Sequence, residues 1–101
     1  LVTGSIIPDA IFAANDMMAV GVLLAMRAAG LRAPADIAVA GFDDIPLARL
    51  IDPPLTTARI RIAEIGRCAL ERLARSIGGE GAEATLETAL PELIVRGSTQ
   101  A

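Results

Sequence analysis

Short apolar runs alternate with a helical pattern along the first half of the chain. Residues 10–14 and 37–42 are apolar runs of the length that buried strands have in parallel sheets. Between them, residues 16–29 run from Asp16, a favoured N-cap residue, to Gly30, a residue type that often ends helices. The pattern predicts a strand–helix–strand unit with parallel strands and a right-handed crossover.

The second half of the chain predicts a turn, a strand, a helix and a return to the sheet. Residues 45–51 suit a short helical turn, which the prolines that follow would end. Residues 55–61 alternate as a strand does, and residues 62–77 place apolar and charged side chains on opposite helix faces. Two further strands, separated by a proline, are predicted at residues 86–90 and 92–96. Strands that alternate with helices predict an α/β fold with a parallel sheet.

The two predicted helices differ in their polar faces. Arg27 is the sole charged residue between Met17 and Ala29. At 100° per residue this first helix has two roughly opposite apolar stripes, one of Met17, Val20, Gly21, Leu24 and Ala28 and one of Met18, Val22, Ala25, Met26 and Ala29. A helix that is apolar all round is buried all round. We expect one stripe to pack on the sheet of this domain and the other to need a partner surface.

The composition is that of a hydrophobic, acidic chain of 101 residues, enough for one domain or part of one. Hydrophobic residues make up 53% of the chain and its mean hydropathy is +0.56, which excludes a disordered tail. The longest apolar stretch, residues 17–26, is far shorter than the roughly 20 residues of a membrane span. The net charge of −3 and the lack of Lys, Trp and Tyr make a poor nucleic-acid surface.

The chain also lacks several residue types on which catalysis depends. It contains no His and no Lys, which removes the usual general base, the commonest metal ligand and the Schiff-base amine. We therefore expect a binding module rather than an enzyme, with no catalytic residue, no metal and no cofactor. The single cysteine, Cys68, can form no internal disulfide, which is typical of a reducing compartment.

Polar side chains follow both strands of the predicted strand–helix–strand unit. Asn15 follows the first strand, and Asp43 and Asp44 follow the second. Proteins of the α/β class bind small ligands outside the carboxyl ends of their strands. Asn15 is either a helix cap or a carboxamide that faces a ligand hydroxyl. The two aspartates are either a solvated acidic turn or acceptors for adjacent hydroxyls, and a catalytic dyad is disfavoured because adjacent side chains usually point apart.

Four short motifs follow one another along the chain. They are AND-x-MA-x-G at residues 14–21, GFDD at 41–44, PPLTT-x-R at 53–59 and LIVRGST at 93–99. In order and spacing the set resembles the effector-binding domain of LacI/GalR-type bacterial transcriptional repressors, which is related to periplasmic sugar-binding proteins. The resemblance covers residues 8–99, and the PPLTT-x-R segment favours the repressors.

This resemblance implies a two-lobe, periplasmic-binding-protein-like fold, of which the chain is the C-terminal portion. Residues 1–54 would belong to the C-terminal lobe. Residues 55–80 would form a crossover strand and helix of the N-terminal lobe, and residues 81–101 would return to the C-terminal lobe. We expect the helix-turn-helix and most of the N-terminal lobe to lie outside this chain.

The resemblance also implies roles for particular residues. Asn15 and Asp43 would contact the effector, Asp16 would cap the helix and Asp44 would form the turn. Ile62 would lie near the floor of the cleft and pack on the effector. A homodimer interface would be formed across a two-fold axis by apolar residues of the first helix and of the segment before the double proline, namely Met17, Val20, Leu24, Leu50 and Ile51.

These expectations define one function and one alternative. The chain is predicted to be the effector-sensing and dimerisation portion of a cytoplasmic bacterial transcriptional regulator. Its effector would be a sugar or nucleoside-like molecule, and it would act by population shift. DNA would be contacted only through an N-terminal region absent from this chain, and no membrane would be involved. The alternative is a periplasmic sugar-binding protein of an ABC transporter, which an upstream signal peptide in place of a helix-turn-helix would reveal.

Overall fold

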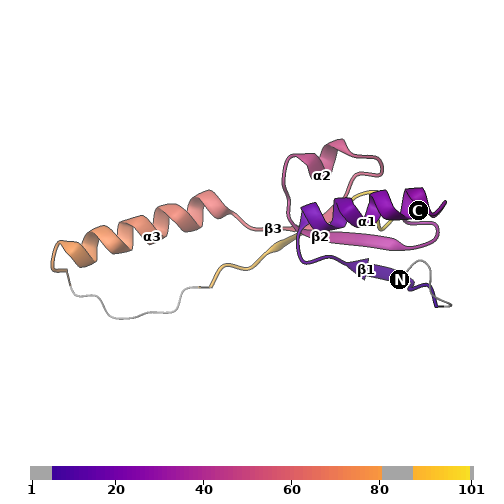
Figure 1. Cartoon of the computed structure of the whole chain (residues 1–101). Coiled ribbons are helices and arrows are strands. Elements are labelled where there is room, and N and C mark those ends of the chain that lie inside the picture. The colour runs from indigo at the N-terminus through magenta and orange to yellow at the C-terminus, as the bar shows by residue number, and fades with distance from the viewer. Residues whose placement is uncertain (1–5, 81–87, 101) are drawn as a thin grey trace. The chain divides into compact units, whose positions relative to one another are not determined.

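A mixed four-stranded sheet forms the centre of the first of two units in the computed structural model, which describes residues 6–80 and 88–100 (Figure 1). Its strands, in order across the sheet, are β1 (Ala10–Phe12), β2 (Ala38–Asp43), β3 (Thr56–Arg59) and β4 (Glu92–Ile94). The first three strands are parallel, and β4 is antiparallel to β3. The predicted α/β fold with a parallel sheet is confirmed, with one antiparallel edge strand added.

Helix α1 (Asp16–Ala28) joins β1 to β2 and packs on β2 (Figure 1). Its inner face consists of residues at helical spacing, namely Ala19, Val22, Leu23 and Met26. They form the core together with apolar residues of the sheet and its connections, chiefly Ile37, Val39 and Leu55. This face shares Val22 and Met26 with the second stripe expected from the sequence and adds Ala19 and Leu23, which belong to neither stripe. Met17 and Leu24 of the first stripe are exposed, and so is Met18 at the edge of the second.

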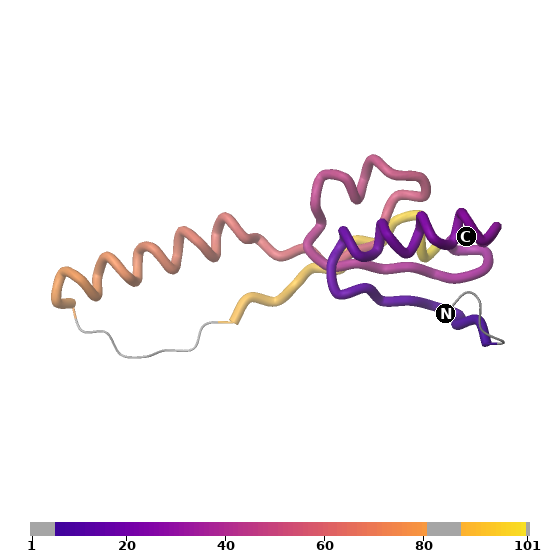
Figure 2. Tube along the Cα trace, in the orientation of Figure 1, coloured from indigo at the N-terminus to yellow at the C-terminus, as the bar shows by residue number. Residues whose placement is uncertain are grey.

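The segment after β4 is hydrogen-bonded both to β2 and to the start of β3. Ser98 is fully buried, and its backbone carbonyl accepts from the Val39 amide at 3.0 Å. Its hydroxyl donates to the Val39 carbonyl and accepts from the Thr56 amide at 2.8 Å. Figure 2 shows this C-terminal segment, in yellow, returning alongside the sheet. The first unit, Leu1–Arg59 with Glu92–Ala101, is thus completed by a stretch distant in sequence.

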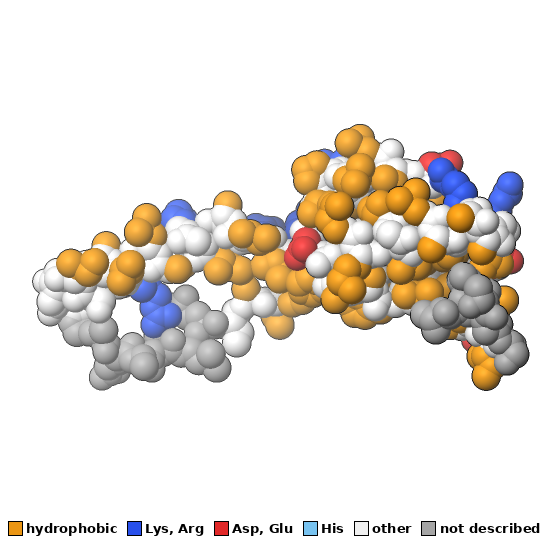
Figure 3. Space-filling model, viewed as in Figure 1, with side chains coloured by type: hydrophobic (Ala, Val, Ile, Leu, Met, Phe, Trp, Pro, Cys, Tyr) orange, Lys and Arg blue, Asp and Glu red, His pale blue; other side chains and the backbone are white. Residues whose placement is uncertain are grey.

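The second unit, Ile60–Pro91, contains helix α3 (Ile62–Ile77). No residue of α3 is buried. Five large apolar side chains along it are at least 44% exposed: Ile62, Ile65, Leu70, Leu73 and Ile77. Figure 3 shows apolar side chains in the open along the visible face of this helix. The described part of the chain therefore supplies no core for this amphipathic helix.

The elements agree with the sequence prediction except in the second half. The short turn forms α2 (Leu47–Leu50) within the predicted 45–51. The strand predicted at 55–61 forms β3, which pairs in register with β2 and lies in the first unit. The chain leaves that unit after Arg59, and the assignment of the two parts to lobes stays a prediction.

The strand predicted at residues 86–90 is not observed. Residues 86 and 87 lie outside the described residues, and residues 88–90 are not in a strand. The strand predicted at 92–96 is shortened to β4. Across the two described ranges, no helix is long and apolar enough to cross a bilayer.

Candidate ligand-binding site

Polar residues gather at the carboxyl edge of the three parallel strands. Asn15 and Asp16 follow β1, Asp43 ends β2 with Asp44 next to it, and Arg59 ends β3. In a parallel sheet these ends lie at one edge, where α/β proteins bind ligands. The structure thus brings the two predicted ligand residues of the first unit, Asn15 and Asp43, to the same edge of the sheet.

Asn15 is the N-cap of α1. Its backbone is extended, with φ −153° and ψ 172°, and its Oδ1 accepts a hydrogen bond from the Met18 amide at 2.9 Å. The prediction that Asp16 caps the helix is therefore wrong. Asn15 Nδ2 has no partner among residues 6–80 and 88–100, so the same carboxamide can cap the helix with its oxygen and donate to a ligand through its nitrogen.

Asp16 is a fully buried carboxylate that joins three segments. It accepts from the Thr57 hydroxyl at 2.6 Å and from the Ile45 amide at 2.9 Å. The first contact ties α1 to β3, and the second ties α1 to the turn after β2. Because Thr57 lies 41 residues further along the chain, its hydroxyl could not enter a prediction based on local capping preferences. Close packing at Gly41 completes this junction, since a Cβ there would collide with Asp16 Oδ1.

Asp43 occupies a backbone conformation that residues with a side chain rarely adopt. Its φ is +118°, and that of Asp44 is +57°. Such a conformation costs about 1–3 kcal/mol and persists where the surroundings hold it, often at ligand-binding sites. No hydrogen bond or ion pair engages the Asp43 carboxylate within the described part of the chain, which leaves all its acceptor capacity available.

Asp44, in contrast, is the centre of a buried charge cluster. Arg59 Nε donates to its Oδ2 at 2.8 Å, and Arg96 Nη1 lies 2.8 Å from Oδ1 as an ion pair without hydrogen-bond alignment. Burial raises the pKa of the Asp44 carboxyl, but its contacts with Arg96 and Arg59 outweigh burial. Its pKa therefore lies below the ordinary value of 3.8. The Asp44 amide also donates to Thr57 Oγ1 at 3.3 Å.

The role predicted for Asp44, that of a turn former, is thus incomplete. The residue does lie in the turn, but its side chain holds two arginines that come from β3 and from the segment after β4. Both arginines stand inside motifs singled out in the sequence, PPLTT-x-R and LIVRGST. That coincidence is the signal from which the cluster could have been suspected.

The remaining predicted ligand residue, Ile62, begins α3 in the second unit. Its side chain is exposed. Its predicted contact with the effector stays a prediction. Across the described ranges, no group of three or more His, Cys, Asp or Glu side chains is placed to hold a metal ion.

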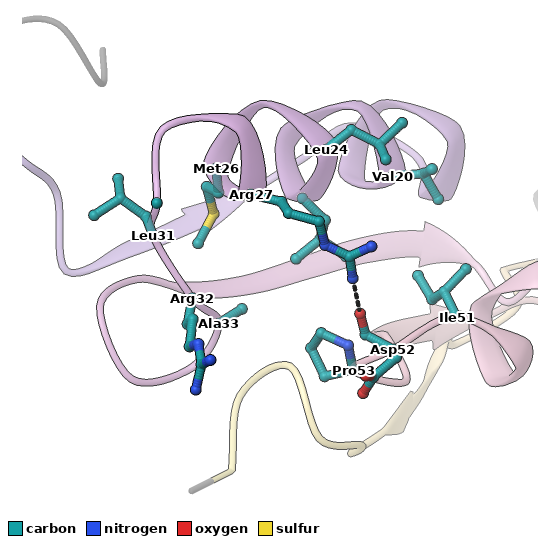
Figure 4. Close-up of a pocket in the computed structure, with 12 residues that line it drawn as sticks. Val20, Leu24, Met26, Arg27, Leu31, Arg32, Ala33, Ile51, Asp52 and Pro53 are labelled. Atoms are coloured by element: carbon teal, nitrogen blue, oxygen red, sulfur yellow. Dashed lines mark hydrogen bonds between the residues drawn. The ribbon is translucent and has the colours of Figure 1, made fainter.

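A separate groove of about 890 Å³ lies along the C-terminal half of α1 (Figure 4). Val20 and Leu24 form one wall, and the segment from Ile51 to Pro53 forms the other. Arg27 Nη2 donates across it to the Asp52 carbonyl at 2.9 Å. Three of the five predicted dimer residues line this groove, and the other two, Met17 and Leu50, are exposed.

Comparison with known proteins gives the same fold. A family model of the periplasmic binding protein-like domain matches residues 2–99. The HTH-type transcriptional regulator MalR of Streptomyces coelicolor is 47% identical over 90 residues, which are 89% of this chain and 26% of that protein. The lactose operon repressor of Rhizobium radiobacter is 45% identical over 95 residues, 92% of this chain and 81% of that protein. The chain thus spans about a quarter of the Streptomyces relative.

Solved structures of similar proteins have the same fold. A LacI family transcriptional regulator from Arthrobacter sp. FB24, in complex with lactose, has a TM-score of 0.80 at 41% identity over 91% of this chain and 35% of its own. The Lac repressor dimer bound to operator and the anti-inducer ONPF has a TM-score of 0.87 at 34% identity, over 95% and 29%. The transcriptional regulator CelR in complex with cellobiose has a TM-score of 0.86 at 38% identity, over 89% of this chain and 28% of its own.

The sheet, its helices and its polar carboxyl edge define a periplasmic binding protein-like effector domain. The chain belongs to the LacI family of transcriptional regulators. The resemblance inferred from the four sequence motifs is thereby confirmed.

Proposed function

We propose that this chain is the effector-sensing portion of a transcriptional regulator and binds a small polyhydroxylated molecule, a sugar or nucleoside-like compound, at the carboxyl edge of its sheet. The observation that carries the proposal is Asp43, an unpartnered carboxylate on a strained backbone next to the anchored Asp44. A carboxylate accepts from two neighbouring hydroxyls at once. Asn15 Nδ2 supplies a donor to the same ligand, and Ile62 an apolar contact.

The relatives support a regulator over the transporter protein. The MalR and lactose operon relatives are a transcriptional regulator and a repressor, and one solved relative holds lactose and another cellobiose. In this proposal the module binds and does no chemistry, and it works in the cytoplasm. DNA is contacted by a region other than this chain. Ligand binding favours one arrangement of the effector domain over another and thereby changes operator affinity.

The test is ligand affinity in the protein expressed from its complete reading frame. Calorimetry with lactose, cellobiose and a set of nucleosides should give one or more measurable affinities. Asp43→Ala should weaken the tightest of them more than tenfold, because a charge-assisted hydrogen bond is worth about 1.5–3 kcal/mol. Asp9→Ala, which removes an exposed carboxylate of the same unit, is the matched control and should bind like the parent. Equal affinity of the Asp43→Ala protein and the parent, or no binding by the parent, would contradict the proposal.

We also propose that the groove along α1 belongs to a homodimer interface formed by Met17, Val20, Leu24, Leu50 and Ile51. The exposure of three of them supports this, since Met17 is 61%, Leu24 is 60% and Leu50 is 76% exposed. A solved relative, the Lac repressor, is a dimer in its complex with operator. A two-fold interface buries the same patch on both subunits.

Sedimentation of a charged variant tests the interface. Val20→Asp would place two like charges near each other in an apolar contact, so the protein should sediment as a monomer at micromolar concentration. Ala25→Asp introduces the same charge at an exposed position elsewhere on α1 and should leave the dimer intact. A Val20→Asp protein that sediments as a dimer would place the interface elsewhere.

A further inference from the structure

Arg59 stands at the point where the chain leaves the first unit, and Glu92 at the point where it returns. The two residues are direct partners in the antiparallel pairing of β3 with β4. On its other side, Arg59 is the register partner of Asp43 in the parallel pairing of β2 with β3. Asp43, Arg59 and Glu92 are therefore neighbours across three adjacent strands. Arg59 lies between the proposed ligand residue and the residue at which the chain returns from the second unit.

The side chain of Arg59 connects the same places through charge. Its Nε donates to Asp44 at 2.8 Å, and its Nη1 lies 3.8 Å from Glu92 Oε2. The two ends of this bridge differ, because the Asp44 side chain is 2% exposed and that of Glu92 is 58% exposed. The guanidinium is thus anchored firmly at the turn and loosely at the returning strand.

We propose that Arg59 is a coupling residue, which links the conformation of the Asp43–Asp44 turn to the two points where the chain crosses into and out of the second unit. The part of this inference that concerns a ligand rests on the proposed function. A ligand that draws on the Asp43 carboxylate acts on a strained turn whose next residue, Asp44, holds Arg59. A shift of the turn moves the guanidinium and changes its contact with Glu92. Coupling of this kind is reciprocal, so a change at Glu92 is felt at the turn.

A purely structural role makes a different prediction. If Arg59 were only the counter-ion of Asp44, the loss of the exposed partner Glu92 would leave the turn unchanged, since Arg59, Arg96 and Asp44 would keep their contacts. Coupling predicts that the turn responds. Two backbone amides report on it, since the Asp44 amide donates to Thr57 Oγ1 and the Ile45 amide to Asp16 Oδ2.

Hydrogen–deuterium exchange on the protein from its complete reading frame distinguishes coupling from a purely structural role of Arg59, and it needs no ligand. Glu92→Gln should speed exchange of the Asp44 and Ile45 amides about twofold to fivefold, the range expected when a partly exposed ion pair is lost. The matched control is Glu71→Gln, which breaks the exposed Arg67–Glu71 pair on α3, 2.8 Å long, and should leave both amides unchanged. Unaltered exchange at the turn in Glu92→Gln, or the same acceleration in Glu71→Gln, would overturn the coupling.

A second arm separates this inference from the proposed function. The ligand that the parent binds most tightly, from lactose, cellobiose and the same set of nucleosides, is titrated into the parent and into both glutamine variants. Glu92→Gln should shift its affinity about twofold to fivefold and Glu71→Gln should not. A parent that binds none of these ligands counts against the proposed function, while the exchange arm still decides whether Arg59 couples the turn to the crossings. Equal affinities in all three proteins would overturn coupling to the ligand.

Discussion

Helices α1 and α3 both follow strands of the same sheet, yet the described chain buries one and leaves the other open. Helix α1 has almost no polar face, but it buries Ala19 and Met26 against β2 and the surrounding core. Helix α3 separates apolar from charged side chains along its whole length and buries none of them. Amphipathic patterning therefore predicts which face of a helix will be buried, but not which surface buries it. In this family member, the described residues leave the apolar face of α3 without cover.

The first test of this comparison adds one methyl group to a glycine in each unit. Gly41→Ala should destabilise the first unit by about 2–4 kcal/mol, because the added methyl group collides with the Asp16 carboxylate and disturbs its buried hydrogen bonds. Gly66→Ala adds the same methyl group to α3, where nothing lies within 4 Å. It should stabilise the helix by about 0.5–1 kcal/mol.

Urea denaturation of the two alanine variants and the parent measures this difference. The comparison fails if Gly41→Ala is as stable as the parent, which would mean that the junction of α1 with the sheet has room to spare. It also fails if Gly66→Ala is destabilising by more than a kcal/mol, which would mean that α3 is packed closely at that position.

A smaller effect concerns acid stability. The pKa of Asp44 is lower in the folded state than its ordinary value of 3.8, so its ion pairs with Arg96 and Arg59 contribute stability that is complete above about pH 5. That contribution is lost as the pH falls through the folded pKa, below 3.8. Asp44→Asn should therefore cost about 1–2 kcal/mol near neutral pH and progressively less as the pH drops toward 3.

The control for this experiment lies in the second unit. Glu71→Gln removes an ion pair of the same length that is exposed to solvent, and it should change stability little at neutral pH. Chemical denaturation at pH 7, 5 and 3 gives the comparison. A cost of Asp44→Asn that is constant over this range would contradict the assignment of the lowered pKa to the buried cluster.

The sequence alone is sufficient for those features that depend on local patterns. Helix α3 matches the predicted 62–77 in both bounds, and β1, α1 and β2 were placed to within two residues. The polar carboxyl edge of the sheet was predicted because polar residues follow the apolar strands in the sequence. Asn15 and Asp16 are both favoured caps, however, and which one caps the helix depends on Thr57, whose hydroxyl engages Asp16.

The Asp44 cluster shows the same limit more clearly. Its arginines lie 15 and 52 residues away along the chain, so the cluster exists only once β3 and the C-terminal segment have joined the sheet. The boundary after Arg59 depends on the register of β3 with β2, which alternation in one strand does not determine. The positive φ of Asp43 is likewise a property of the assembled turn.

The most direct test of the central claim, that the ligand binds at the carboxyl edge of the sheet, is a crystal structure of the complete protein. It is grown with whichever ligand of the calorimetric set binds most tightly. We expect ligand hydroxyls within hydrogen-bond distance of the Asp43 carboxylate and of Asn15 Nδ2, with Asn15 Oδ1 still capping α1 and Asp44 still paired with Arg59 and Arg96. A ligand seated in the groove beside Val20 and Arg27, or one that leaves the Asp43 carboxylate without a ligand contact, would contradict the account.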